Sequence, residues 1–303
     1  MKNDNILEIK GLSKSFGEKK VLSGLDLSVP RGSVFGFIGR NGAGKTTTMK
    51  TVLGLLKPNG GDIYVDGKAV TYGETPTNSV IGYLPDVPEF YPFMTPVEYL
   101  RLCGECGGIS SAEIKKRTAE LLALVGLEDD AERRIKGFSR GMKQRLGIAQ
   151  ALLHRPKLLI CDEPTSALDP LGRREILDIL VSVKNETTVL FSTHVLSDVE
   201  RICDSVAFLE QGSIAMRGSI DELKKLNSAR EFVVEVVTSS GADEIAVKFP
   251  DATRESEERL NFFGGDEAMK KVISFIANEG IAVTKIERLE PSLETLFVEV
   301  MGK

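Results

Sequence analysis

A glycine-rich loop between a short apolar strand and a helix constrains the fold of this chain most. Residues 34–38, VFGFI, have the pattern of a buried strand, and GRNGAGKTT follows at once, so that Gly39, four residues and Gly44-Lys45-Thr46 come in order. Apolar residues then recur at helical spacing over 49–56. Strand, loop and helix in this order are typical of a phosphate-binding loop. The alternative is a glycine-rich turn without a ligand, and the lysine and threonine at these positions argue against it.

The residue types of this loop suit an anion. Glycines at 39, 42 and 44 let the backbone wrap closely and point its N–H groups inward, while the helix N-terminus adds partial positive charge. Lys45 is expected to reach the β- and γ-phosphates of a nucleotide, and Thr46 to ligate the Mg²⁺ that bridges them.

Two adjacent acids follow a second apolar strand. In KLLICDEP the strand runs from Leu158 to Cys161 and ends at Asp162 and Glu163. Because side chains alternate along a strand, the two carboxylates should point in different directions and have different roles. We expect Asp162 to hold Mg²⁺ and Glu163 to polarise the attacking water. The alternative is a solvated strand end.

The chain has two histidines, and they differ in context. TVLFSTHVLSDVE predicts a strand that ends at His194, before a helix starting around Ser197. In parallel α/β sheets the ligand crevice lies at the carboxyl ends of the strands, so we expect His194 to contact the γ-phosphate instead of being a plain buried histidine. His154 falls at the end of a helix, where it complements the helix dipole and has a structural role.

Bulk properties exclude several classes. With 303 residues, the chain predicts one large domain and a smaller one, and its net charge of -5 argues against wholesale nucleic-acid binding. No apolar run approaches the roughly 20 residues that cross a bilayer. The segment MKNDNILEIKG lacks the apolar core of a signal peptide, so a cytosolic location is expected. Cys103 and Cys106 form a CxxC, but neither a second ligand pair nor a thioredoxin-like context accompanies it, which favours two unremarkable residues near a helix end.

Taken together, the motifs resemble one family. GRNGAGKTT, GYLPD, FSRGMKQR, LLICDEP, SALD and STH occur in this order over about residues 5–220, and the series is similar to the ATP-binding subunits of ABC transporters. Within that family the chain looks most like the subunits of ABC-2 type exporters, which have an SxGMxQR signature and a C-terminal domain ending in PSLExxF. Here the ending is EPSLETLFVEV.

The resemblance implies that the site is shared between two subunits. In this family the signature segment, here residues 138–145, binds the γ-phosphate held by the phosphate loop of the other subunit. Ser139 would offer a hydroxyl, Gly141 a close backbone N–H, and a helix starting near Met142 its dipole. Arg140 departs from the glycine of the best-known pattern and adds charge and bulk.

Other family roles carry over by position. Phe16 matches the aromatic residue that stacks on adenine, its alternative being a residue of a strand core. Asp86 matches the residue that senses Mg²⁺ and the γ-phosphate, its alternative being a turn cap before Pro88. The loop 166–169 matches the connection between the two sites. The region from about Asp86 to Ile135 matches the helical subdomain, in which YPFMTPVEYLRL contacts the membrane partner.

The expected fold is an α/β P-loop NTPase core of the ABC type with a helical subdomain, plus a small C-terminal α+β domain. We place the ATPase domain at 1–222, its helical subdomain at about 86–150, and the accessory domain at 223–303. The accessory domain has no recognisable catalytic group, and its role in dimerisation, in docking or as a passive cap stays open.

The expected cofactors are ATP and Mg²⁺. Glu163 and His194 are expected to be catalytic, and Thr46, Asp86 and Asp162 to hold the metal. The residues expected to bind ATP are Phe16, Gly39, Arg40, Asn41, Gly42, Ala43, Gly44, Lys45, Thr46, Thr47, Asp86, Ser139, Gly141 and Asp169.

The resemblance predicts an ATPase that powers an exporter. Its partners would be an integral membrane permease and a second ATP-binding subunit, in a homodimer or a heterodimer, without nucleic acid, at the cytoplasmic face of the membrane. The alternative is a soluble ABC ATPase acting on ribosomes or DNA. Such proteins usually have two ATPase domains or a long coiled-coil insertion, and the about 117 residues from Lys45 to Asp162 leave no room for one.

Overall fold

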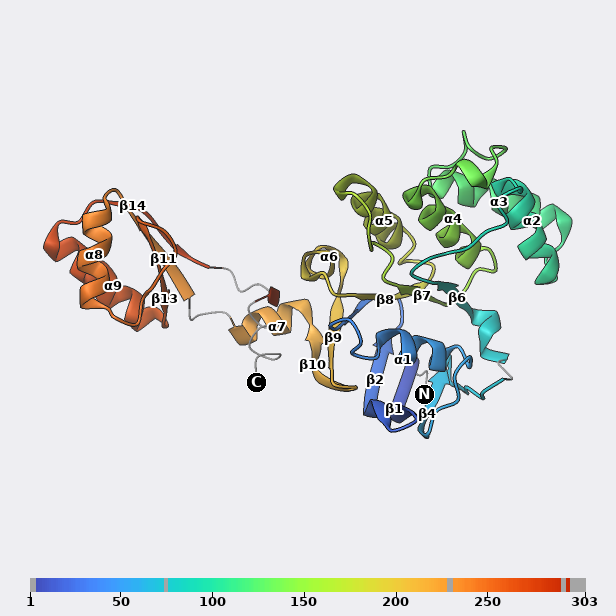
Figure 1. The fold of residues 1–303 in the computed structure, drawn as a ribbon, viewed down its shortest axis with the longest axis horizontal. Coiled ribbons are helices and arrows are strands. Elements are labelled where there is room, and N and C mark those ends of the chain that lie inside the picture. Colours follow the sequence, from blue (N-terminus) through green and yellow to red (C-terminus); the bar gives the residue numbers. More distant parts are fainter. Residues whose placement is uncertain (1–3, 74–75, 228–230, 290–292, 295–303) are drawn as a thin grey trace. The chain divides into compact units, whose positions relative to one another are not determined.

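The computed structural model describes residues 4–73, 76–227, 231–289 and 293–294 (Figure 1). The chain divides into two compact units, Met1–Ser219 and Ile220–Lys303. The sequence had placed this boundary after residue 222. Within the described ranges, none of the helices combines the length and the apolar character needed to cross a membrane.

An antiparallel sheet forms one layer of the first unit. Its strand order is β2-β1-β4-β5. The strands are β1 (Asn5–Phe16), β2 (Lys19–Pro30), β4 (Gly60–Val65) and β5 (Lys68–Ala69). In β2, Leu25, Leu27 and Val29 alternate with exposed residues and are buried, so one face of the sheet packs on the core.

The second sheet has six strands in the order β10-β9-β3-β8-β7-β6. They are β3 (Val34–Ile38), β6 (Ile81–Leu84), β7 (Leu158–Asp162), β8 (Thr188–Thr193), β9 (Ser205–Glu210) and β10 (Ser213–Ser219). All neighbours are parallel except β9 and β10, which make an antiparallel edge. Every residue of β3, β7 and β8 is buried, as is typical of parallel strands covered on both faces.

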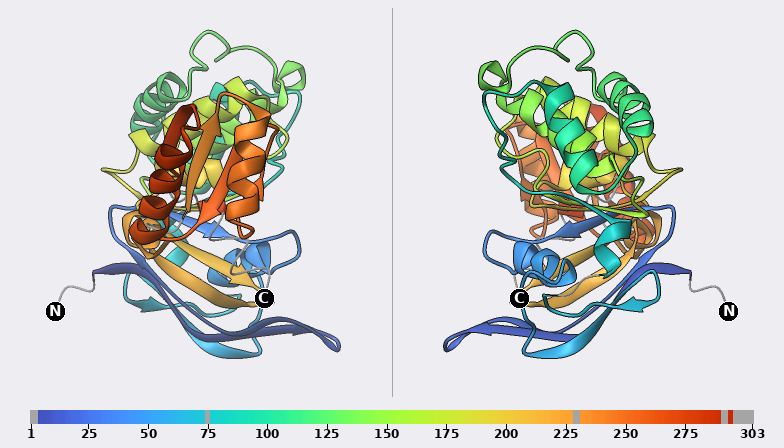
Figure 2. Two further views of the ribbon diagram at one scale, coloured as in Figure 1. Left: turned by 90° about the vertical axis from the view of Figure 1, so that its left-hand side faces the viewer. Right: turned by 90° about the vertical axis from the view of Figure 1, so that its right-hand side faces the viewer.

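Helices cover both faces of the six-stranded sheet. Met49 and Val52 of α1 (Lys45–Val52) share one core cluster with Leu25 of the first sheet and Ile160 of the second. Figure 2 shows the first sheet, in blue, on one side of the unit and the green helices on the other. Besides α1, the described helices of the first unit are η1 (Pro76–Val80), α2 (Pro96–Cys106), α3 (Ser111–Leu124), η2 (Ile135–Gly137), α4 (Arg140–Leu152), α5 (Pro170–Ser182) and α6 (Leu196–Ile202).

The helices α2, α3 and α4 pack on one another within the region expected to be the helical subdomain. A capping box starts α2, because the Thr95 side chain accepts from the Glu98 N–H while Glu98 accepts from the Thr95 N–H. Pro96 occupies the first helical position, where its missing N–H costs nothing. Ser110 caps α3 in the same way that Ser139 caps α4.

The second unit is a small α+β domain. Its sheet has the antiparallel order β12-β13-β11-β14, and α8 and α9 lie on one face of it (Figure 1). Its elements are α7 (Ile220–Asn227), β11 (Glu231–Val236), α8 (Ser239–Lys248), β12 (Thr253–Arg254), β13 (Arg259–Phe263), α9 (Asp266–Glu279) and β14 (Val283–Arg288). This order of elements from β11 onwards is the ferredoxin-like βαββαβ arrangement. The PSLETLF motif lies mostly outside the described residues.

Candidate functional site

The phosphate loop, residues 39–47, connects β3 to α1 at the carboxyl edge of the six-stranded sheet. Gly44 has φ 112°, and a Cβ there would lie 2.7 Å from Leu22 Cδ2. A Cβ on Gly39 would lie 2.8 Å from the carbonyl oxygen of Leu209. The two positions therefore require glycine for the fold of the loop itself. The same edge receives the ends of β7 and β8, which are neighbours of each other.

Lys45 lies inside the loop with only 6% of its surface exposed. Its ammonium donates to the carbonyl oxygens of Gly39 at 2.6 Å and Arg40 at 3.3 Å. It also lies 3.0 Å from Glu163 Oε1. The buried cation thus has its counter-ion within the same chain, which a buried charge needs.

Asp162 and Glu163 lead to different partners. Asp162 ends β7, is buried, and accepts a hydrogen bond from Ser192 Oγ at 2.6 Å. The same hydroxyl accepts from the Glu163 N–H at 3.0 Å. Alternation along a strand was the wrong reason for their divergence, because β7 ends at Asp162 and Glu163 turns away with φ 48°. A non-glycine residue in this left-handed region is uncommon and is found at functional turns.

His194 follows β8 and lies against Glu163. Its Nδ1 is 3.0 Å from Glu163 Oε2, and 49% of its side chain is exposed. The alternative of a plain buried histidine is therefore wrong. Glu163 sits between Lys45 on one oxygen and His194 on the other, so these three predicted residues form one cluster.

The remaining loop residues are placed for contact with a ligand. Arg40, Asn41, Gly42 and Thr46 are exposed, and Ala43 and Thr47 are half-buried. Phe16 is the last residue of β1 and is 49% exposed, so its alternative as a core residue is wrong. The Lys14 ammonium lies 4.9 Å from the centre of the Phe16 ring, and the ring can stack on a further flat group.

The signature segment has a different character. Its helix α4 begins at Arg140, earlier than the expected start near Met142, because the Ser139 hydroxyl caps the first turn by accepting from the Met142 N–H at 3.2 Å. A Cβ added to Gly141 would meet nothing closer than Leu168 Cδ2 at 3.9 Å. Packing within this chain therefore does not require glycine at 141.

Asp86 is the predicted site residue whose partners differ most from the expectation. Its carboxylate accepts from Ser166 Oγ and lies 3.5 Å from Arg140 Nη2, and 49% of the side chain is exposed. Both partners are far along the chain instead of in the turn before Pro88. Asp169, the last expected ATP-binding residue, is exposed and begins α5, but its side chain makes no capping hydrogen bond.

Sequence reasoning missed several polar residues that support these loops. Ser192 is paired in register with Asp162, and a serine within an apolar strand was the signal that could have found it. Asp198 is buried, accepting from Thr165 Oγ1 at 2.8 Å and Arg173 Nε at 2.6 Å. Gln144, fully buried in α4, was also missed, since nothing in the pattern of that helix distinguishes it.

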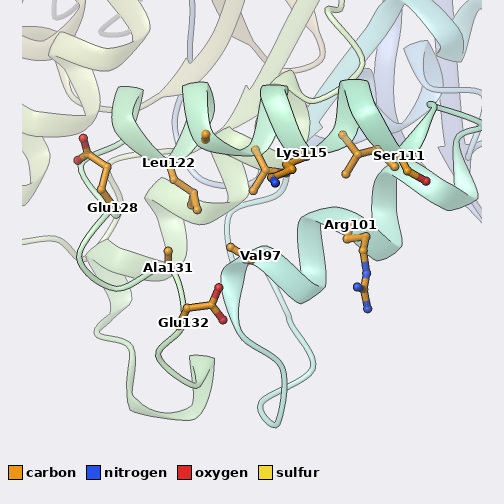
Figure 3. Close-up of a pocket in the computed structure, with 11 residues that line it drawn as sticks. Val97, Arg101, Ser111, Lys115, Leu122, Glu128, Ala131 and Glu132 are labelled. Atoms are coloured by element: carbon orange, nitrogen blue, oxygen red, sulfur yellow. The ribbon is translucent and has the colours of Figure 1, made fainter.

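The other candidate features are separate from this cluster. Cys103 and Cys106 are free thiols on α2, and burial raises the pKa of Cys103, which keeps it protonated and a poor ligand or redox group. In the described part of the chain, no group of three or more His, Cys, Asp or Glu side chains is placed to hold a metal ion. A groove of about 620 Å³ lies between α2, α3 and the loop after α3, with Val97 and Leu122 pointing into it (Figure 3). Its lining shares no residue with the predicted site.

Known proteins resemble the chain over most of its length. A family model described as ABC transporter matches residues 22–166. The chain is 37% identical to an uncharacterized ABC transporter ATP-binding protein, YxlF, of Bacillus subtilis (strain 168), over 98% of this chain and 99% of that one. It is 34% identical to the bacitracin transport ATP-binding protein BcrA of Bacillus licheniformis, over 98% and 97%.

A solved structure supports the same relationship. It is described as the ATP binding subunit of an ABC transporter, with a TM-score of 0.66 and 36% identity, over 73% of this chain and 93% of that one. The mixed α/β fold with its phosphate loop is accordingly that of a P-loop NTPase. The chain belongs to the ABC transporter ATP-binding proteins: it is an ATP-binding, ATP-hydrolysing subunit of the kind that works with membrane permease components.

Proposed function

We propose that the chain powers an exporter by ATP-driven dimerisation, with each ATP held between the phosphate loop of one subunit and the signature segment of the other. The observation that carries this proposal is a difference between the phosphate loop and the signature segment in how far their groups have partners within the chain. Lys45 and Glu163 are mutually paired within the chain, whereas Ser139 is exposed and, among the described residues, no atom comes closer than 3.9 Å to a Cβ placed on Gly141.

In this proposal the nucleotide binds along the exposed side of the phosphate loop. The adenine stacks on Phe16, the backbone N–H groups of residues 39–47 receive the phosphates, and the N-terminus of α1 faces the anion. Asp169 and the loop 166–169 connect this site to the one across the dimer.

Magnesium fits the residue types present. Thr46, Asp162 and Asp86 would hold it, and when bound it would offset the charge of the phosphates. Protein sites for Mg²⁺ commonly use one or two carboxylates and complete their shell with substrate oxygens, which agrees with the lack of a larger acidic cluster in the described ranges.

Glu163 is the proposed general base. In this structure Oε1 faces the Lys45 ammonium in an ion pair without an aligned hydrogen bond, and Oε2 faces the His194 ring. Binding of the phosphates draws Lys45 toward them and frees one oxygen of Glu163 to orient water. His194 remains beside the carboxylate and contacts the γ-phosphate with its exposed edge.

The membrane partner is proposed to dock on the helical subdomain. A groove of about 430 Å³ lies between residues 87–92, η2 and the first turn of α4. It is lined by Val87, Pro88, Glu89, Phe90, Pro92, Ile135, Lys136, Arg140 and Lys143. Tyr91 and Phe93 beside it are 52% and 59% exposed. This surface, which combines apolar and mostly basic side chains, suits a cytoplasmic segment of the permease that carries apolar and acidic residues, and it would place the subunit at the inner face of the membrane. Transport of bacitracin is named for BcrA, and this supports export over an action on ribosomes or DNA.

Gel filtration of the Glu163→Gln variant tests the shared site. The amide keeps the size of the side chain but cannot act as a base, so the variant should bind ATP, lose hydrolysis by about 10²- to 10⁴-fold and accumulate as a dimer with Mg-ATP. The same variant with ADP is the control and should stay monomeric. A variant that elutes only as monomer with Mg-ATP would contradict the proposal.

A further inference from the structure

Three motif loops meet at the first turn of α4. Arg140, its first residue, donates from Nη2 to Ser166 Oγ at 3.0 Å and lies 3.5 Å from Asp86 Oδ1. The Ser166 hydroxyl in turn donates to Asp86 Oδ1. One guanidinium therefore joins the loop after β6 to the loop after β7.

Gln144, one turn further along the same face of α4, contacts the same two loops. Its side-chain Nε2 donates to the carbonyl oxygens of Asp86 and Pro164, each at 3.1 Å. Gln144 is fully buried, whereas the side chain of Arg140 is 44% exposed. The buried amide fixes the backbones of both loops. The guanidinium can leave its partners for water or another anion without stranding a buried charge.

We propose that Arg140 is a positioning residue that exchanges partners during the ATPase cycle. In the nucleotide-free subunit it holds Asp86 and Ser166, and in the ATP-bound dimer it turns to the triphosphate carried by the other subunit. The second half rests on the proposed function, since Arg140 lies between Ser139 and Gly141 in the signature segment. Asp86 and the triphosphate are then competitors for one cation.

This competition has a definite sign. A triphosphate carries more charge than one carboxylate and accepts the planar, forked donors of arginine well, so it should win once the dimer closes. The exchange releases Asp86 at the moment when ATP is present. Until then, the ion pair with Asp86 should oppose dimerisation. It should raise the ATP concentration required for dimerisation about two- to fivefold, because exposed ion pairs contribute energies of that size.

Hydrogen–deuterium exchange of the nucleotide-free subunit tests the first half. In Arg140→Ala, amides of residues 84–92 and 163–169 should exchange faster than in the wild type. Arg140→Lys should fall between them, because lysine presents a point charge and not a planar fork. Lys116→Gln, which removes an exposed charge from the neighbouring helix α3, is the control and should match the wild type. If residues 84–92 and 163–169 of Arg140→Ala exchange as in the wild type, the intrachain contact is overturned, whether or not other segments change.

A double-mutant cycle in the Glu163→Gln background tests the second half. The ATP concentration for half-maximal dimer formation should rise about tenfold in Arg140→Ala, since a charge-assisted contact to phosphate is lost. Asp86→Asn should ease dimerisation two- to fivefold more when Arg140 is present than when it is alanine. Equal effects of Asp86→Asn in both backgrounds overturn the exchange of partners. If Glu163→Gln never dimerises, the proposed function fails and the exchange with it, while the deuterium experiment still decides the intrachain contact.

Discussion

The phosphate loop and the signature segment are both proposed to bind the phosphates of ATP, but they differ in how many of their polar groups have partners within the chain. At the phosphate loop a buried lysine already has a carboxylate at 3.0 Å, and glycine is demanded at 39 and 44 by close approach of the chain's own atoms. At the signature segment the serine is exposed, and the glycine at 141 has no close neighbour. The phosphate loop thus has its charge pair within one subunit, whereas the exposed face of the signature segment is where we propose that the second subunit brings its nucleotide.

Ser139→Arg should break the comparison most clearly. The added bulk should block the approach of a second subunit and reduce hydrolysis by more than about 100-fold, the loss seen when a transition-state donor is removed. Nucleotide binding to the monomer should stay within about twofold of the wild type, because the phosphate loop is untouched. Equilibrium binding of a fluorescent ATP analogue and steady-state turnover measure the two effects. A parallel loss of binding would show that the two ends are not independent.

Lys45→Ala should have the opposite pattern. ATP affinity of the monomer should fall about 10- to 100-fold, since a hydrogen bond to a charged group contributes roughly 1.5–3 kcal/mol. Lys50→Ala, on an exposed position of the same helix, is the matched control and should bind normally. The same titration with the analogue checks both variants. Normal affinity in Lys45→Ala would contradict the proposal that Lys45 binds the phosphates of ATP.

Asp86→Gln sharpens the comparison, because Asp86 contacts Arg140 of the signature segment and is also proposed to hold the metal at the phosphate loop. The variant should still hydrolyse ATP, with its half-maximal Mg²⁺ concentration shifted a few-fold as the carboxylate proposed to reach the metal becomes an amide. Asp86→Ala should lose coupling to the membrane partner more than it loses nucleotide affinity. Turnover titrated with Mg²⁺, together with transport by the reconstituted complex, measures both. Superimposable Mg²⁺ curves for Asp86→Gln and the wild type, together with normal transport by Asp86→Ala, would leave Asp86 only the role of a turn cap before Pro88.

The smallest effect is expected at Asp66, which belongs to neither end. Its carboxylate lies 2.7 Å from Lys157 Nζ. The hydrogen bond from Lys157 is the main cause that lowers the pKa of Asp66, and Arg31 lowers it further. Because the pKa of Asp66 is lower in the folded than in the unfolded state, the carboxylate contributes stability above the ordinary pKa range of aspartate. This contribution is lost as the pH falls from that range through the folded-state pKa. Asp66→Asn should cost at most about 1 kcal/mol at pH 7 and nothing in strong acid. Urea unfolding at pH 7 and at low pH measures the difference, and a constant difference would contradict the charge effect.

The local patterns of the sequence were sufficient for the elements that position the nucleotide. The strand over 34–38 was predicted with the bounds that the structure has, because an all-apolar run between turn signals allows little else. The clustering of Lys45, Glu163 and His194 followed from one rule, that ligands meet the carboxyl ends of parallel strands. The partners of Asp86 could not be predicted, since Arg140 comes close through the packing of α4 on β6, and Ser166 follows β7, which pairs with β6.

The strand order also has a consequence for biosynthesis. The β1–β2 hairpin needs only the first 30 residues, whereas β3 pairs with β8 and β9, so that Phe35 lies opposite Leu190 and Ser205. Contacts of such sequence separation form late, because the intervening chain must first be ordered. The GRNGAGKTT segment leaves the ribosome early but gains its supporting strands only after about two thirds of the chain has been translated. The phosphate loop is therefore the part of the nucleotide site that is made first and supported last, because β3 lies between β8 and β9 in the sheet.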